Sequence, residues 1–170
     1  PIACANLPYN ITHPRHSPAS LMAGCFGSIT CDQREVARRI CAAPGTGDYG
    51  AFSVYCQYHT KPEILFDVPL LLYPRTQGDF LRAAHGTPDP PAEVDDPKHF
   101  FQVVRAAFAQ RRKTLLNSLS SALGGTYQKE AIANAIAQCS LPENIRGERL
   151  SISDFAALSK ALRRQETRSL

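Results

Sequence analysis

Four consecutive residues near the start of the chain, Asn6-Leu7-Pro8-Tyr9, can together hold a flat group that carries an amine. The Asn6 side-chain oxygen is one hydrogen-bond acceptor. The Leu7 carbonyl is a second, and Pro8 restricts its direction because a proline disfavours helical geometry for the residue before it. Tyr9 adds an aromatic face on which a ring can stack. The competing interpretation is a turn that ends a strand, with Tyr9 in the core.

A run of three cations, Arg111-Arg112-Lys113, is the second candidate for chemistry. Residues 98–170 carry 12 Lys and Arg against 5 Asp and Glu, a net charge of +7, whereas residues 1–97 carry −3. This asymmetry favours a polyanionic partner, and the role it indicates for the run is phosphate contact in a nucleic acid. The surrounding pattern predicts that the run is helical, so at most two of its side chains face one partner. The alternative is a solvated basic face.

Other chemistry-bearing residue types form no set. The six cysteines include no Cys-x-x-Cys pair, so neither a zinc site nor a disulfide framework is predicted, and reduced thiols are expected. His59, His85 and His99 lack the spacing of metal ligands and are interpreted as structural. Phe66 and Tyr73 are expected in the core.

The elements that must position the first motif predict an α/β layer. Residues 1–5 are small and apolar, which is typical of a buried strand that ends at the motif. Residues 33–43 have one apolar face and predict a helix that Pro44-Gly45 stops. Residues 52–59 alternate apolar with polar side chains and predict a strand, and residues 63–68 predict another.

The second half of the chain is predicted to be all α. Three prolines within residues 87–91 forbid both helix and central strand, so a domain boundary is expected there. Asp96 is a good N-cap before Pro97 and a run of apolar residues at helical spacing. Residues 126–139 predict a further helix. Residues 150–155 open the last one, with a capping box and a hydrophobic staple.

Length and composition exclude several classes of protein. A chain of 170 residues, 44% apolar and 20% charged, can form one core and a small appendage, so disorder and collagen-like structure are excluded. The longest apolar run, residues 68–73, is too short to span a membrane. The start, Pro1-Ile2-Ala3-Cys4, lacks the pattern of a signal peptide and is expected to lie inside a domain.

Residues 3–12, Ala-Cys-Ala-Asn-Leu-Pro-Tyr-Asn-Ile-Thr, resemble motif IV of the rRNA adenine N6,N6-dimethyltransferases, in particular the bacterial kasugamycin-susceptibility type. Residues 33–39, followed by Gly47-Asp48-Tyr49-Gly50 and Ser53-Val54, resemble the next helix and strand of that family. Residues 103–115 resemble the start of its helical C-terminal domain. Order and spacing agree over about two thirds of the chain.

The resemblance implies dimethylation of N6 on two adjacent adenines near the 3′ end of small-subunit rRNA, with S-adenosylmethionine as methyl donor. The adenine amine is a poor nucleophile, because its lone pair is delocalised into the ring. The implied catalytic residues are Asn6 and Leu7, which accept the two amino hydrogens, and Tyr9, which stacks on the extracted base. Asn6 is also the implied contact to the cofactor. The implied contacts to the RNA are Pro8, Tyr73, Arg111, Arg112 and Lys113.

The implied fold is α/β, the C-terminal part of a Rossmann-like methyltransferase sheet followed by a small all-α domain. The incomplete methyltransferase domain is expected over residues 1–87, a Pro-rich linker over 88–96 and a helical rRNA-binding domain over 97–170. The implied partner is small-subunit rRNA or the pre-ribosomal small subunit. A cytoplasmic monomer without membrane contact, active in ribosome biogenesis, is expected.

The sequence departs from the family pattern in two ways. The Gly-rich loop for S-adenosylmethionine and the acidic residues for its ribose and adenine are expected to be absent from this chain, so the chain alone is expected to bind the cofactor poorly and to be inactive. Residues 13–23 and 70–86 lack an apolar helix and a Phe-x-Pro-x-Pro-Lys-Val motif, respectively. Frameshifted reading and ordinary divergence both explain such windows, and irregular structure is expected in both.

Two alternatives remain open on the sequence alone. A non-catalytic RNA-binding or ribosome-assembly module would account for the basic second half and the missing cofactor loop. A methyltransferase acting on adenine N6 of large-subunit rRNA would share the strand-end residues, although Asn6 to Thr12 and Gln110 to Leu115 look more like the small-subunit group.

Overall fold

The computed structural model of the protein describes residues 2–6, 27–68, 78–85 and 92–168. Packing divides the chain into two units. The sheet unit comprises Pro1–Ala43 and Gly47–Pro90, and the helical unit comprises Pro44–Thr46 and Pro91–Leu170. The short segment Pro44–Thr46 therefore packs with the second unit although its sequence neighbours belong to the first.

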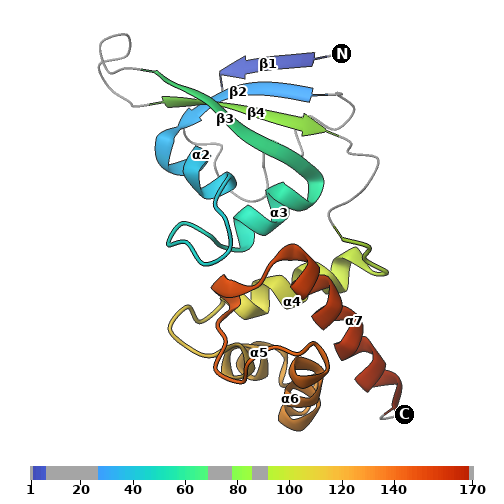
Figure 1. Ribbon diagram of the computed structural model, residues 1–170. Coiled ribbons are helices and arrows are strands. Elements are labelled where there is room, and N and C mark those ends of the chain that lie inside the picture. The colour runs from blue at the N-terminus through green and yellow to red at the C-terminus, as the bar shows by residue number, and fades with distance from the viewer. Residues whose placement is uncertain (1, 7–26, 69–77, 86–91, 169–170) are drawn as a thin grey trace. The chain divides into compact units, whose positions relative to one another are not determined.

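Four strands form one sheet among the described residues, in the order β1-β2-β4-β3 (Figure 1). They are β1 (Ile2–Asn6), β2 (Gly27–Gln33), β3 (Thr60–Val68) and β4 (Gly78–His85). β1 runs parallel to β2, whereas β4 pairs antiparallel with both β2 and β3. The strands predicted over residues 1–5 and 63–68 are confirmed as β1 and β3.

Helix α2 (Arg34–Ile40) follows β2 directly and confirms the amphipathic helix predicted over residues 33–43. Its buried side includes Ala37 and Ile40, and its exposed side carries a Glu35–Arg39 ion pair of 2.9 Å at helical i, i+4 spacing.

Residues 51–59 form helix α3 (Ala51–His59), so the strand predicted from their alternation is wrong. Buried polar contacts explain the difference. Ser53 is fully buried, accepts a hydrogen bond from the Gly50 backbone N–H and donates one to the Arg39 carbonyl. The Gln57 amide donates to the carbonyls of Ile40 and Ala42, both at 2.8 Å. These bonds satisfy carbonyls at the C-terminal end of α2 and just beyond it, and a helical turn brings Ser53 and Gln57 to the same side.

Strand β4 lies inside the window 70–86, and irregular structure is therefore the wrong expectation for Gly78–His85. No proline interrupts this segment, so each residue can contribute its backbone groups, and pairing with β2 on one side and β3 on the other provides their partners. A paired strand counts against a frameshifted origin of this window and favours divergence. Residues 13–23, 70–77 and 86 lie outside the described residues.

The helical unit contains α4 (Pro97–Phe108), α5 (Leu115–Leu123), α6 (Lys129–Gln138), the 3-10 turn η2 (Gly147–Arg149) and α7 (Ile152–Arg168). These helices surround a core of large side chains, each of which contributes about 1.5–3 kcal/mol on burial. The largest fully buried ones are Phe100, Leu115, Leu119, Ile132, Leu150, Phe155, Leu158 and Leu162. None of the described helices is both long and apolar enough to cross a membrane.

Two of the predicted helix starts are confirmed in detail. Asp96 Oδ1 accepts hydrogen bonds from the backbone N–H groups of Lys98 at 3.0 Å and His99 at 3.2 Å. The Asp154 carboxylate accepts from the Ser151 backbone N–H at 2.9 Å, and the Ser151 hydroxyl accepts from the Asp154 N–H at 3.2 Å, which closes a capping box.

Candidate functional site

The strand-end motif, defined as Asn6-Leu7-Pro8-Tyr9, begins at the last residue of β1. Asn6 lies beside Cys31 in the parallel pair of β1 and β2. In open α/β sheets, ligands bind outside the carboxyl ends of parallel strands, and Asn6 occupies such an end. Leu7, Pro8 and Tyr9 lie outside the described residues, as does Tyr73. The structure therefore places the start of the motif and leaves the roles of its members as predictions.

Phe66 is 56% exposed, so its predicted core position is wrong. β3 is an edge strand of the described sheet, and its register shifts between Ile64 and Phe66. Ile64 and Leu65 are also exposed, to 37% and 38%. An edge strand with an irregular register leaves its side chains less covered than a central strand does.

The cations Arg111, Arg112 and Lys113 are exposed and lie in a turn, because α4 ends at Phe108 and α5 begins at Leu115. The predicted helical position of this run is wrong. The limit of two side chains facing one partner, which followed from helical geometry, no longer applies.

We call the turn that contains these three cations the first turn. Buried Ser118 holds it against the end of α4. Its hydroxyl donates to the carbonyls of Ala106 at 2.8 Å and Ala107 at 3.1 Å, and it accepts from the Gln110 backbone N–H at 3.3 Å. The Gln110 side chain donates to the Ser121 hydroxyl at 3.0 Å. Carbonyls at a helix end need such partners, so a single serine both satisfies α4 and fixes the start of the turn.

A second turn, residues 143–149, packs beside the first. The Leu115 N–H donates to the Ile145 carbonyl at 2.7 Å, and Arg111 Nε lies 3.7 Å from Glu148 Oε2. A Cβ on Gly147 would lie 2.8 Å from the Ala107 carbonyl oxygen, so only glycine permits this approach to α4. The Arg111–Glu148 pair is 60% and 25% exposed, and such pairs contribute at most about 1 kcal/mol. Its importance is therefore positional.

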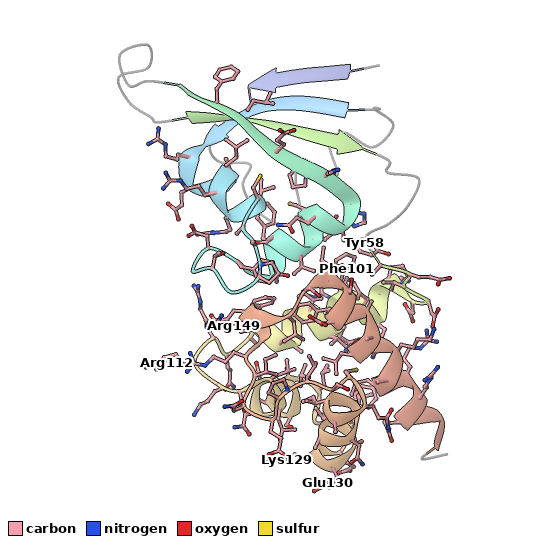
Figure 2. All side chains as sticks on the ribbon, viewed as in Figure 1. Tyr58, Phe101, Arg112, Lys129, Glu130 and Arg149 are labelled. Carbon is pink, nitrogen blue, oxygen red and sulfur yellow. The ribbon has the colours of Figure 1, made fainter. Side chains whose placement is uncertain are left out.

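The second turn brings two further exposed arginines, Arg146 and Arg149, to the first. We call these two together with Arg111, Arg112 and Lys113 the two-turn basic surface. Figure 2 shows Arg112 and Arg149 on the same side of the helical unit. Sequence reasoning missed Arg146 and Arg149 because they are more than 30 positions from the first run. A usable signal is the glycine between them in Arg-Gly-Glu-Arg, which marks a close backbone approach.

Gly45, which packs within the helical unit, supports Arg149. Its N–H donates to the Glu148 carbonyl at 2.7 Å, and its φ of +87° lies in the region that favours glycine. A Cβ at this position would lie 3.2 Å from Arg149 Nη1, so the arginine side chain covers the glycine.

A Gly-x-Gly-x-x-Gly pattern, which the sequence interpretation missed, occurs at Gly45-Thr46-Gly47-Asp48-Tyr49-Gly50. It connects helix α2 to helix α3. The dinucleotide-binding fingerprint requires the pattern to follow a strand and open a helix, so this context does not match a cofactor loop.

His99 belongs to internal packing. His99 Nδ1 lies 2.7 Å from the Ser159 hydroxyl and His99 Nε2 lies 3.0 Å from the Tyr127 hydroxyl, which links α4 to α7 and to the segment before α6. No group of three His, Cys, Asp or Glu side chains suited to a metal ion occurs in the part of the chain that the structure describes.

Three cysteines with described side chains, Cys41, Cys56 and Cys139, are free thiols. Burial raises the pKa of the Cys41 thiol to about 11, and burial likewise raises the pKa of Cys139. Both thiols therefore stay protonated at neutral pH, which disfavours a nucleophilic role.

Comparison with known proteins gives a family match over nearly the whole chain. The family model described as ribosomal RNA adenine dimethylase matches residues 2–160. The chain is 41% identical over 163 residues to a protein of Geobacillus kaustophilus named ribosomal RNA small subunit methyltransferase A, and 40% identical to one of the same name from Bacillus cytotoxicus. Each match covers 93% of this chain and about half of the relative, 55% and 56%.

Two solved structures share the fold. A dimethyladenosine transferase from Plasmodium falciparum aligns with a TM-score of 0.78 over 96% of this chain and 67% of its own, at 16% identity. The 23S rRNA methyltransferase ErmE aligns with a TM-score of 0.64 over 95% of this chain and 65% of its own, at 17% identity. The fold is therefore the C-terminal part of a Rossmann-like methyltransferase sheet followed by a small helical unit.

Proposed function

Because the chain belongs to the ribosomal RNA adenine dimethylase family, we propose that it forms part of an enzyme that dimethylates N6 of two adjacent adenines near the 3′ end of small-subunit rRNA. The observation that carries this proposal is the family match over residues 2–160, together with curated relatives named for the small ribosomal subunit. The chain spans about half the length of those relatives, so the activity of the whole protein is proposed here.

The strand-end motif holds the acceptor base in this proposal. Asn6 ends β1 at the carboxyl edge of the parallel strand pair, which is the edge where open α/β sheets bind their ligands. The Asn6 side-chain oxygen and the Leu7 carbonyl accept the two amino hydrogens of adenine, which aims the nitrogen lone pair at the methyl carbon. Tyr9 stacks on the extracted base, and Pro8 fixes the direction of the Leu7 carbonyl.

The methyl transfer needs positioning more than a strong base. S-adenosylmethionine would supply the methyl group, and the part of this chain is to hold the acceptor amine. With both amino hydrogens held by Asn6 and Leu7, the N6 lone pair is the group left to react, and the proton released from N6 passes to water. The second methyl group would replace the hydrogen that remains. Holding the amine in a near-attack geometry lowers the activation barrier, by about 7–11 kcal/mol in well-oriented cases.

The family implies S-adenosylmethionine as the methyl donor, and the described residues alone do not fit it. Their one Gly-x-Gly-x-x-Gly pattern connects two helices, and no described strand is followed by such a loop. Asn6 is the proposed contact of this chain to the donor. The remaining contacts belong, in this proposal, to the part of the relatives' length that the chain does not span.

The helical unit binds rRNA in this proposal. Arg111, Arg112 and Lys113 are exposed cations in one turn of a segment with a net charge of +7, and phosphate contacts are the role that such side chains serve. Tyr73 is the proposed aromatic contact to a base. The proposed setting is the pre-ribosomal small subunit in the cytoplasm, with the enzyme acting as a monomer.

The test is methyl transfer from labelled S-adenosylmethionine to small subunits that lack the two dimethyladenines. The chain is fused behind the first half of the Geobacillus kaustophilus relative, and the unfused chain is measured beside it. We expect label on the 3′ region of the small-subunit rRNA with the fusion, and none with the unfused chain. A fusion that folds, binds the donor and leaves these adenines unlabelled contradicts the proposal.

A non-catalytic role in RNA binding is the second candidate function, and the two-turn basic surface favours it specifically. This surface lies wholly in the helical unit and involves no residue of the strand-end motif. RNA binding by the chain, combined with an inactive fusion, is the outcome that selects this candidate.

A further inference from the structure

The two turns of the basic surface are held as one unit by three independent contacts. The Leu115 N–H donates to the Ile145 carbonyl at 2.7 Å, which joins the end of the first turn to the middle of the second. Gly147 touches the end of α4, from which the first turn departs. Glu148 lies 3.7 Å from Arg111, so its carboxylate bridges the two turns.

The charge of the second turn is balanced differently from that of the first. The first turn holds three cations and no acidic residue, whereas the second holds Arg146 and Arg149 together with Glu143 and Glu148. Glu148 is engaged with Arg111, and Glu143 is exposed. The combined surface carries five cations and two carboxylates, a balance that fits a polyanion.

Arg149 is the cation of the second turn whose position is best fixed. Its side chain lies over Gly45, where a Cβ would come within 3.2 Å of Nη1. The Gly45 N–H donates to the carbonyl of Glu148, the residue that precedes Arg149. An ordered, exposed guanidinium loses less side-chain entropy on binding than a free one, and its planar donors match phosphate oxygens.

We propose that Arg149 is a further phosphate-contacting residue, so that RNA is bound across both turns and not by Arg111–Lys113 alone. Glu148 is the positioning residue, because its carboxylate holds Arg111 while its backbone carbonyl anchors Gly45 beneath Arg149. This inference rests on the proposed RNA-binding role of the helical unit. The proposed partner is RNA phosphate. Five cations on two adjacent turns suit contacts to the phosphates along an RNA backbone, and such contacts carry no sequence information.

The experiment measures binding of the 170-residue chain to a fluorescent, unmodified transcript of the 3′ domain of small-subunit rRNA, over about 50–200 mM salt. Arg149→Gln is expected to lower the slope of log affinity against log salt by about 1, as one lost phosphate contact does. Arg149→Lys keeps the charge and is expected to keep the slope. Arg164→Gln removes an exposed arginine near the end of α7 and is expected to leave the slope unchanged.

Each outcome decides the inference. An unchanged slope in Arg149→Gln overturns it, and so does an equal loss in Arg164→Gln, which would indicate a general charge effect. If Arg149→Lys lowers the salt slope as much as Arg149→Gln does, Arg149 acts through its packing over Gly45, and the inference is overturned. Displacement of the transcript by polyglutamate as effectively as by unlabelled RNA points to an acidic protein and also overturns it.

The double variant Arg111→Ala/Arg112→Ala separates this inference from the proposed function. A lower slope in the double variant with none in Arg149→Gln overturns only the extension to the second turn. No change in either variant overturns the RNA-binding role of the helical unit itself.

Discussion

The strand-end motif and the two-turn basic surface differ in how their residues come together. The motif is four consecutive residues whose position follows from the end of one strand, β1. The basic surface joins residues 111–113 to residues 146 and 149 through contacts between α4, α5 and η2. Local sequence therefore indicates the first directly and shows only part of the second.

The two regions also affect different free energies, which are the activation free energy for the motif and the binding free energy for the basic surface. Positioning of a reacting amine depends on a few acceptors at fixed distances, and loss of one changes the rate. Phosphate contacts act through charge, are screened by salt and change affinity in increments. Damage to the motif is thus expected to appear in the rate of methyl transfer, and damage to the basic surface in the salt-dependent affinity for RNA.

The largest effect is expected for Asn6→Ala in the fusion with the first half of the Geobacillus relative. The Asn6 side-chain oxygen accepts a hydrogen bond that strengthens in the transition state, and its removal lowers kcat by about 10²-fold or more. RNA affinity and its salt dependence should remain as in the parent fusion, because the basic surface is intact. A loss of affinity equal to the loss of rate would break the comparison. Single-turnover methyl transfer and fluorescence titration provide the two numbers.

The next effect is expected for the double variant Arg111→Ala/Arg112→Ala. The slope of log affinity against log salt should fall by up to about 2, roughly one for each lost phosphate contact. In the fusion, KM should rise while kcat at saturating small subunits stays within a small factor of the parent. Arg164→Gln is the control. A fall in kcat with unchanged KM would place these arginines in the chemistry and contradict the division of roles.

The same contrast explains what the sequence could predict. The caps at Asp96 and Ser151, the strands β1 and β3, and helix α2 were predictable because each depends on residues within a few positions. Helix α3 was not, because the eight residues 52–59, with period-two apolar spacing, fit a strand equally well. Its helical form depends on Ser53 and Gln57 bonding the end of α2, which is a tertiary contact.

Two further misses have the same origin. Strand β4 departs from the expected family pattern, yet its backbone pairs between β2 and β3, and pairing depends little on side-chain identity. Phe66 has the side chain of a core residue but lies in an edge strand where the register shifts. Arg146 and Arg149 join the surface only because Gly147 lets η2 approach α4. The roles of Leu7, Pro8, Tyr9 and Tyr73 stay predictions.

Gly147→Ala tests whether the basic surface depends on tertiary packing. The new Cβ would lie 2.8 Å from the Ala107 carbonyl oxygen, and such overpacking costs about 1–3 kcal/mol of unfolding free energy. Displacement of η2 should also reduce the salt slope, although no cation is removed. Gly125→Ala is the matched control, since a Cβ there meets nothing within 4 Å. Urea unfolding with an unchanged midpoint in Gly147→Ala would show that the two turns adjust independently.

The smallest effect is expected at a purely local feature, the Asp96 cap of α4. The backbone N–H of His99 is the main cause that lowers the pKa of the Asp96 carboxyl from 3.8, with further contributions from Lys98 N–H and the charge of Arg163. Because the folded pKa is the lower one, the stabilising contribution is present above 3.8 and is lost as the pH falls through the folded value.

Asp96→Asn isolates this contribution, because asparagine caps a helix about as well as aspartate and does not titrate. At pH 7 the variant should unfold at nearly the same urea concentration as the parent. As the pH falls below 3.8, the parent should lose stability more steeply than the variant. Asp95→Asn removes the neighbouring carboxylate without touching the cap and should keep the steeper loss. Equal slopes in Asp96→Asn and the parent would mean that the Asp96 hydrogen bonds add nothing that depends on charge, and that local capping at this helix is independent of ionisation.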